Sequence, residues 1–487
     1  MNGAVRLPGR RVRAATRVVA ALLATGCGAL PTGPAGDTRD PPDHSPDAPR
    51  ILKLQAVPSP ANALAAFVTW ETDVPVPTRL DVDCEGEYTP SFTSDESFTD
   101  HEVFLMGLWE GADCTLAVTA DDGSAVVTAT LALQDAGPLP ELLPVLFLNV
   151  LDEARVAPGW TAWSLSDPDE GGPLRLFLVD ARGRYRWYHF GDDSVKAGAG
   201  AELQQVEGGL LQAAGGPDMI LGWDGKPLWE APFSSHHDLQ LSPWDPDRLF
   251  YLGVSSKNCA TPEHTVVEFD RALSEQVWEW RICEHYIPPD PYDGWSHVNT
   301  VAFFPDEAGK LLLSVRNQDV LLRVDRDSGD IDWVLGWDGD FEMAPEDLFL
   351  RQHAPEFLEN GEILLFDNGL EQDEADRKGD DPAKVRPVSR VIQLALTFHG
   401  DGSPDAARVT WEYLDPALFA FARSEADRLP NGNTLITYSQ LAPGNDSMLR
   451  EVTLERDVVW ELRTPPQWST YRAERMTPVS GEVRSRP

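Results

Sequence analysis

Residues 297–336 read HVNTVAFFPDEAGKLLLSVRNQDVLLRVDRDSGDIDWVLG, and this stretch decides which fold we expect. It opens on His297, runs through two apolar stretches that an acidic turn separates, and ends in a short strand that carries Trp333. Short apolar runs bounded by turn residues are typical of β-strands. We therefore interpret the segment as one antiparallel unit of short strands.

Strands that carry a tryptophan, like the one with Trp333, recur along much of the chain. The six tryptophans are Trp187, Trp229, Trp278, Trp333, Trp411 and Trp460. They lie 42, 49, 55, 78 and 49 residues apart, close to the length of a four-stranded blade that buries its faces against its neighbours. The repeat predicts an all-β protein with a six-bladed β-propeller. The longest interval contains EQDEADRKGDDPAKV (371–385), which we interpret as a solvated loop insertion.

Three histidines share one position in three of these units. His237, His297 and His353 precede the second apolar strand of their units by 12, 14 and 10 residues. Because the first strand of each blade lines the central channel, residues at this position should converge on the axis. We expect the three imidazoles to face one another across a pocket. The remaining single histidines are expected to be surface or structural residues: His44, His101, His189, His264, His285 and His399.

The first residues indicate export. Five arginines precede a short apolar run at 18–24, which is too short to span a bilayer, and then Cys27. This pattern resembles a bacterial lipoprotein signal peptide at 1–26, with Cys27 as the lipidated first residue of the mature chain; plain secretion is the alternative. The protein is then expected at the cell envelope, in the periplasm or at the outer membrane, touching the membrane only through its lipid. Residues 27–49, rich in Pro, Gly and Asp, are predicted to be a disordered tether.

Two further regions follow the tether. Residues 50–136 alternate apolar and polar side chains, and VTWETDVPVPTRL (68–80) with HEVFLMGLWEGADCTLAVTADDG (101–123) resembles a fibronectin type III β-sandwich. Residues 137–487 form the predicted propeller. Apart from Cys27, four cysteines remain, an even number that suits an oxidising compartment. Their order suggests the pairs Cys84–Cys114 and Cys259–Cys283, with unpaired buried thiols as the alternative.

The charge of the chain excludes nucleic acid as a partner. Acidic residues number 79 and basic residues 40, so the formal charge is −39, and removing the five arginines of residues 1–26 makes it −44. Phosphate binding requires the opposite charge. No GxxxxGK[ST] or GxGxxG motif supports nucleotide binding, and no CxxC spacing supports zinc. We expect no cofactor and no metal, and no oligomeric state is predicted.

Five separated motifs resemble one known family. They are SSHHDLQLSP (234–243), the unit at 296–336, RQHAPEFLENGEILLFDNG (351–369), SRVIQLAL (389–396) and ADRLPNGNTLI (426–436). Together they resemble the bacterial arylsulfotransferases, and the resemblance covers roughly residues 140–475. The family transfers sulfuryl groups from aryl sulfates without a nucleotide donor.

The resemblance implies a set of site residues. In the family a histidine takes up the sulfuryl group, and His353 occupies that position. The implied catalytic residues are His353, His297, His237 and Arg316. The implied substrate-binding residues are Asn299, His236 and Ser424. The HHD doublet leaves the choice between His236 and His237 open.

The implied reaction moves a sulfuryl group from an aryl sulfate to a phenolic acceptor through a sulfohistidine, independently of the donor PAPS. A neutral imidazole is a competent nucleophile near pH 7, and Arg316 would stabilise the negative charge of the transition state. Two alternatives stay open. One is a non-catalytic, surface-anchored propeller that binds a ligand or a partner protein, and the other is a hydrolase that passes the same intermediate to water.

Overall fold

The computed structural model describes residues 49–121, 126–133, 137–165, 175–191, 202–213, 218–288, 292, 294–372, 374–375, 384–479 and 484–485. The chain divides into two units, Met1–Asp47 and Ala48–Pro487, and every described residue belongs to the second. The predicted signal peptide, Cys27 and nearly all of the tether lie outside the described residues. Among the described residues, no helix is long and apolar enough to cross a membrane.

Strands from residues 51–133 form one antiparallel sheet, in which the long strands β2 and β3 shift register between Glu71 and Thr78. Its strands are β1 (Ile51–Pro58), β2 (Ala66–Cys84), β3 (Ser91–Leu105), β4 (Cys114–Asp121), β5 (Val126–Leu133) and β31 (Arg484–Ser485). β31 is far from the other strands in sequence and joins the sheet by pairing with β3. The fibronectin type III resemblance remains a prediction.

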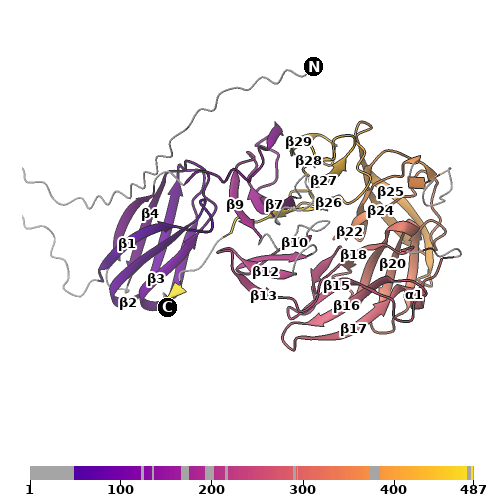
Figure 1. The fold of residues 1–487 in the computed structure, drawn as a ribbon, viewed down its shortest axis with the longest axis horizontal. Coiled ribbons are helices and arrows are strands. Elements are labelled where there is room, and N and C mark those ends of the chain that lie inside the picture. The colour runs from indigo at the N-terminus through magenta and orange to yellow at the C-terminus, as the bar shows by residue number, and fades with distance from the viewer. Residues whose placement is uncertain are drawn as a thin grey trace, which may run out of the picture. The chain divides into compact units, whose positions relative to one another are not determined.

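The rest of the described chain is built from separate antiparallel sheets, so the all-β, propeller-like prediction is confirmed (Figure 1). Four sheets are continuous in sequence: β10 (Glu202–Val206), β11 (Gly209–Ala213), β12 (Met219–Gly222) and β13 (Pro227–Glu230); β14 (Leu239–Leu241), β15 (Arg248–Ser255), β16 (Glu263–Asp270) and β17 (Glu275–Arg281); β18 (Val298–Phe303), β19 (Lys310–Val315), β20 (Val320–Asp325) and β21 (Ile331–Gly336); β22 (His353–Phe357), β23 (Ile363–Asp367), β24 (Arg390–Phe398) and β25 (Pro404–Leu414). The helical turn α1 (Ile282–His285) follows β17, and the 3₁₀ turn η1 (Arg316–Gln318) lies between β19 and β20 of one sheet.

Two more sheets combine strands from distant parts of the sequence. The fifth contains β26 (Glu425–Arg428), β27 (Thr434–Leu441), β28 (Asp446–Val452), β29 (Val458–Arg463) and β6 (Phe147–Leu151); the sixth contains β30 (Ala473–Met476), β7 (Trp160–Leu165), β8 (Arg175–Val179) and β9 (Tyr185–Phe190). Backbone hydrogen bonds therefore join the end of the chain to strands from its first half. The closed six-bladed ring remains a prediction.

The six recurring tryptophans all lie in the fourth strand of a sheet. In every case the pairing of the third and fourth strands shifts register directly beside the tryptophan. Such a bulge turns the edge strand and re-aims its side chains. Three of these indoles reach another sheet: Trp187 Nε1 donates to the Trp223 carbonyl (2.9 Å), Trp411 Nε1 to the Leu454 carbonyl (2.8 Å) and Trp460 Nε1 to the Ala181 carbonyl (2.7 Å). The repeat thus corresponds to contacts between sheets.

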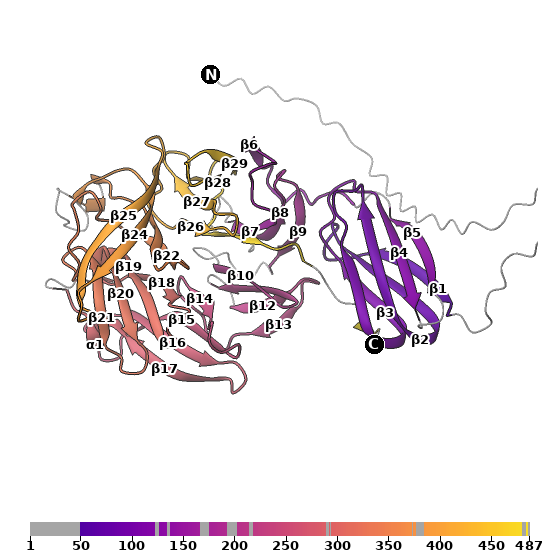
Figure 2. The same ribbon diagram turned by 180° about the vertical axis from the view of Figure 1, so that it is seen from behind.

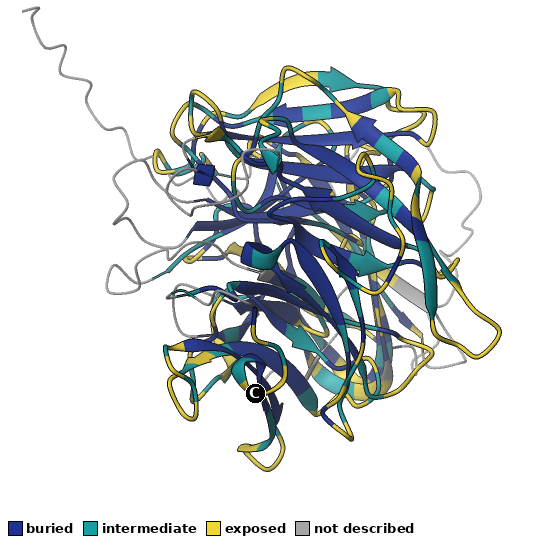
Figure 3. Ribbon diagram, turned by 90° about the vertical axis from the view of Figure 1, so that its right-hand side faces the viewer, coloured by how far each residue is buried: buried dark blue, intermediate teal, exposed yellow. Residues whose placement is uncertain are grey.

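The first strands of the sheets lie around the centre of this body (Figure 2). They are β10, β14, β18, β22, β26 and β30. Buried residues run along the strands and exposed residues gather at the turns (Figure 3). Residues at equivalent ends of the first strands are consequently brought together, although they are far apart in sequence.

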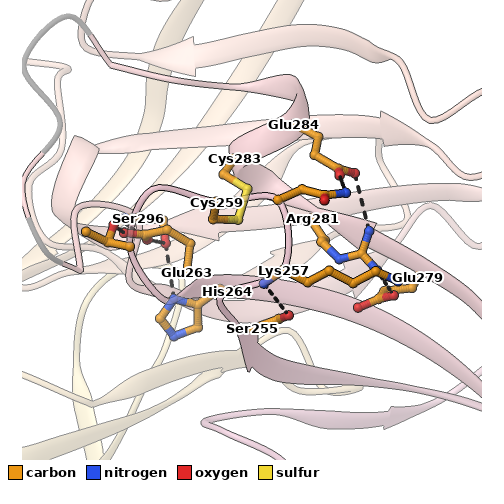
Figure 4. Close-up of a disulfide and its surroundings, with 12 residues drawn as sticks. Ser255, Lys257, Cys259, Glu263, His264, Glu279, Arg281, Cys283, Glu284 and Ser296 are labelled. Atoms are coloured by element: carbon orange, nitrogen blue, oxygen red, sulfur yellow. Dashed lines mark hydrogen bonds and ion pairs between the residues drawn. A yellow bond between two sulfur atoms is a disulfide. The ribbon is translucent and has the colours of Figure 1, made fainter.

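Both predicted disulfides are confirmed. Cys84–Cys114 joins the end of β2 to the start of β4, and Cys259–Cys283 joins the loop before β16 to α1. Each bridge is expected to stabilise the fold by about 2–4 kcal/mol. The second bridge also holds the loop that leads into Glu263 and His264 (Figure 4).

Candidate active site

The site is built at the starts of four first strands. His237 lies two residues before the start of β14, His297 lies directly before β18, His353 opens β22, and Ser424 lies directly before β26. The left-handed backbone is used at three of these positions, with φ of 73° at His237, 41° at His297 and 78° at Ser424. This conformation costs roughly 1–2 kcal/mol for a residue with a side chain. The three residues thus share this conformation at the starts of their sheets' first strands.

His237 and His297 are in direct contact. Their Nε2 atoms lie 3.1 Å apart, so one imidazole donates a hydrogen bond to the other. The Tyr471 hydroxyl shares a hydrogen bond with Nδ1 of His237 (3.1 Å). The convergence that the sequence predicted for these two histidines is therefore present. Tyr471, which follows the fifth sheet, was not predicted.

A second chain of hydrogen bonds runs from a buried carboxylate to an exposed imidazole. Ser296 Oγ donates to Glu263 Oε2 (2.5 Å), and His264 Nδ1 lies 3.1 Å from Ser296 Oγ (Figure 4). The other ring nitrogen of His264, Nε2, lies 2.9 Å from His236 Nδ1. His236 is exposed, and its ring centroid is 4.0 Å from that of His237. The expectation that His264 is unrelated to the site was wrong, because it reaches the cluster from the third strand of its sheet.

The His353 imidazole is held in one tautomer. Its Nδ1 lies 2.7 Å from Asn368 Oδ1 and 3.0 Å from the Arg351 carbonyl. Asn368 Nδ2 donates to the carbonyls of Ala420 (2.8 Å) and Arg423 (3.1 Å), so the amide oxygen must face His353. Both neighbours of Nδ1 are therefore acceptors, and Nδ1 carries the proton. The lone pair is left on Nε2.

Arg316 is buried beside the histidines but is not an isolated charge. Its Nη1 lies 3.1 Å from Oε1 of Glu374, and Nε of Arg351 lies 3.4 Å from the same oxygen. Arg316 itself begins η1, directly after β19. Glu374 belongs to the insertion that we expected to be solvated. It is 7% exposed because it neutralises two buried guanidinium groups.

Asn299 and Ser424 are fully buried at the same level and hydrogen-bond to neighbouring segments. Asn299 Nδ2 donates to the Gln352 carbonyl (2.8 Å), directly before His353. Ser424 Oγ accepts from the Ser439 backbone N–H (3.0 Å). Both side chains thus connect strands of the site.

The pKa values of three histidines lie well below the ordinary value. For His353 the main cause is desolvation by burial, followed by the positive charge of Arg316; the same two causes lower the pKa of His297. For His237 burial is again first, followed by His297. These imidazoles are therefore neutral near pH 7, as a nucleophile or a proton acceptor requires.

A cavity of about 410 Å³ lies further along the first strands. Its lining includes Thr300, Ala354, Glu356, Glu425 and Arg472, but none of the site histidines. The guanidinium of Arg472 donates to Thr300 Oγ1 (2.9 Å) and to the Asn299 carbonyl (3.2 Å), and its charge contributes to the low pKa of His353. Arg472, which sequence reasoning missed, thus lines the cavity and also acts on the histidines.

Comparison with known proteins identifies the family. No curated protein matches the chain. Two solved structures are weakly similar: KlHsv2 with loop 6CD replaced by a Gly-Ser linker (9% identity, TM-score 0.29, covering 75% of this chain and 99% of that one), and a eukaryotic initiation factor (8% identity, TM-score 0.25, covering 82% and 97%). Similarities this weak support no argument. The profile of the family described as Arylsulfotransferase (ASST) matches residues 169–463, more than half of the chain. The chain belongs to the arylsulfotransferase family.

Proposed function

We propose that the protein transfers a sulfuryl group from an aryl sulfate to a phenolic acceptor through a sulfohistidine on His353. In the first step Nε2 of His353 attacks sulfur, the N–S bond forms, and the bond from sulfur to the aryl oxygen breaks. The phenolate leaves with that electron pair. In the second step the acceptor oxygen attacks sulfur, the N–S bond breaks and His353 is regenerated.

The observation that carries this proposal is the fixed tautomer of His353. A nucleophilic imidazole needs a lone pair on the attacking nitrogen and a partner that holds the other nitrogen. Asn368 and the Arg351 carbonyl supply that partner at Nδ1. The low pKa of His353 keeps the lone pair unprotonated near pH 7.

The residues around His353 can stabilise the negative charge that develops in the transition state. Sulfuryl transfer resembles phosphoryl transfer, in which negative charge spreads over peripheral oxygens and is stabilised by positioned donors. Arg316 and Arg472 lower the pKa of His353 by their charge, so both contribute positive potential at the proposed nucleophile. The negative substrate also favours protonation of the His237–His297 pair. That pair would protonate the leaving phenolate and later take the proton of the acceptor phenol, a step typically worth about 10²- to 10⁴-fold.

The proposal is tested with purified protein and p-nitrophenyl sulfate, with and without added phenol. Release of nitrophenolate only with phenol supports transfer, and release without phenol supports a hydrolase. No release in either case, although the protein is folded, would favour the non-catalytic propeller that binds a ligand or partner. The family assignment supports aryl sulfates and phenols as the substrates to try first.

We predict that activity persists at acidic pH. His353 attacks in its neutral form, and because its pKa is lowered, this form remains the major one below pH 6.5. kcat/KM measured from pH 8 downward should stay level through about pH 6.5 and fall only at lower pH. An acid limb centred at or above the ordinary histidine value would contradict the proposed environment of the nucleophile.

Asn368 is predicted to be a positioning residue. Asn368→Leu removes the nearer of the two acceptors at Nδ1 of His353 and leaves only the Arg351 carbonyl, so the preference for the tautomer with the lone pair on Nε2 is weakened. We expect kcat to fall about 10- to 100-fold with KM little changed. Asn368→Asp keeps an acceptor and should retain more activity. ¹⁵N NMR of His353 should show Nδ1 protonated in the wild type and a tautomer mixture in Asn368→Leu; an unchanged spectrum would contradict this role.

Export and lipidation of Cys27 are also part of the proposal. The two disulfides support an oxidising compartment such as the periplasm. Mass spectrometry of the protein isolated from membranes should find acyl chains on an N-terminal Cys27. A mature, unmodified N-terminus in the soluble fraction would indicate plain secretion.

A further inference from the structure

We propose that His236, His237 and His264 form a zinc-binding site at the mouth of the candidate active site, and that bound Zn²⁺ inhibits sulfuryl transfer. The inhibition rests on the proposed function, whereas the binding does not. No metal was expected from the sequence, because a histidine doublet and a third histidine 27 residues later match no recognised ligand spacing.

The three imidazoles are close enough to share one ion. One donor nitrogen from each lies within 4.8 Å of the other two, and Nδ1 of His236 is 2.9 Å from Nε2 of His264. Nitrogen ligands of tetrahedral zinc, at about 2.1 Å from the metal, lie about 3.4 Å from one another. The widest nitrogen–nitrogen separation, at most 4.8 Å, must therefore shorten by up to about 1.4 Å. Rotation of the exposed His236 ring can supply this shortening.

The orientation of His264 suits a ligand. Ser296 Oγ has a single hydrogen, and it is donated to Glu263 Oε2. Ser296 Oγ must then accept from Nδ1–H of His264, which leaves the lone pair on Nε2, the atom that faces His236. Metal-binding histidines commonly donate their other N–H to a carboxylate or an oxygen linked to one. The Cys259–Cys283 bridge restrains the loop before these residues (Figure 4).

The chemistry of the donors selects the ion. Neutral imidazoles suit zinc, copper and nickel, whereas magnesium and calcium require oxygen ligands. Three protein ligands leave a fourth position for water or a sulfate oxygen. Because His236 is exposed, an ion can reach the site from solvent.

Bound zinc would prevent His237 from acting as a base. A neutral imidazole has one lone pair, and a metal bound there prevents His237 from accepting a proton. It would also compete with the hydrogen bond between His237 and His297. Zinc is therefore expected to lower turnover without unfolding the protein.

Binding is tested with full-length protein that has been stripped with EDTA and titrated with ZnCl₂ against a chromophoric chelator. We expect about one zinc per chain, and affinity at least about tenfold weaker in His236→Gln and in His264→Gln. His236→Gln changes an exposed residue and should fold normally even if His264→Gln does not. The control is His399→Gln, at an exposed histidine beside Asp405, which should bind like the wild type. No zinc retention, or equal affinity in all four proteins, would overturn the site.

Inhibition is tested separately by nitrophenolate release at increasing ZnCl₂ and after EDTA is added back. Wild-type and His399→Gln protein should lose most activity at saturating zinc and recover with EDTA. Zinc binding with unchanged turnover would overturn the inhibition alone. Turnover without zinc binding would overturn the metal site and leave the sulfotransferase proposal intact. Zinc binding without any turnover would support the metal site and count against the proposed activity.

Discussion

Replacing His353 by alanine is expected to lower turnover of an aryl sulfate by at least about 10⁴-fold, because the nitrogen that attacks sulfur is then missing. Nδ1 of His353 is held by Asn368 and the Arg351 carbonyl, which leaves Nε2 to attack. The measurement is the steady-state rate of nitrophenolate release with phenol as acceptor.

The control for this substitution is His399→Ala, at an exposed position. It should retain the wild-type rate, and both variants should melt close to the wild-type temperature. A folded His353→Ala protein with an undiminished rate would end the assignment of the nucleophile.

Replacing Arg316 by alanine is expected to lower kcat by about 10²- to 10³-fold, the loss typical of removing one positioned donor from a transition state. After burial, the charge of Arg316 is the largest cause of the lowered pKa of both His297 and His353. Arg351 remains beside Glu374 after the change, so the carboxylate keeps a partner and the fold should be retained. Arg316→Lys should recover part of the rate, since an ammonium keeps the charge but not the planar donors.

The control for Arg316 is Arg408→Ala, at an exposed arginine on β25, which should change neither kcat nor stability. Glu374→Gln supplies the opposite test. It frees the charge of Arg316 from its buried partner and should strengthen binding of aryl sulfate, seen as a lower KM. An Arg316→Ala protein with normal kcat would show that Arg316 only neutralises Glu374.

Much of the fold could be predicted because it repeats. The tryptophan of each unit marks a bulge between the third and fourth strands, and that regularity is visible as spacing in the sequence. The contact between His237 and His297 followed from their equivalent positions before first strands. Pairing of the cysteines in sequence order was also confirmed.

Residues outside the repeated position could not be found in this way. Asn368 follows a second strand, His264 lies on a third strand, and Glu374 comes from an insertion. None shares a period with the site histidines, and each acts through a contact over a long sequence separation. A highly charged loop is usually solvated, so nothing in the sequence of residues 371–385 distinguished Glu374 from its neighbours. The partner of Arg316 became visible only when the chain was folded.

The central claim is most directly tested by trapping the covalent intermediate. The protein is mixed with excess aryl sulfate in the absence of acceptor, quenched at alkaline pH, digested and mapped by mass spectrometry. The account predicts the added mass of one SO₃ group on the peptide that contains His353, and its loss when phenol is added before the quench. Turnover with no sulfated peptide, or with the group on a different residue, would contradict it.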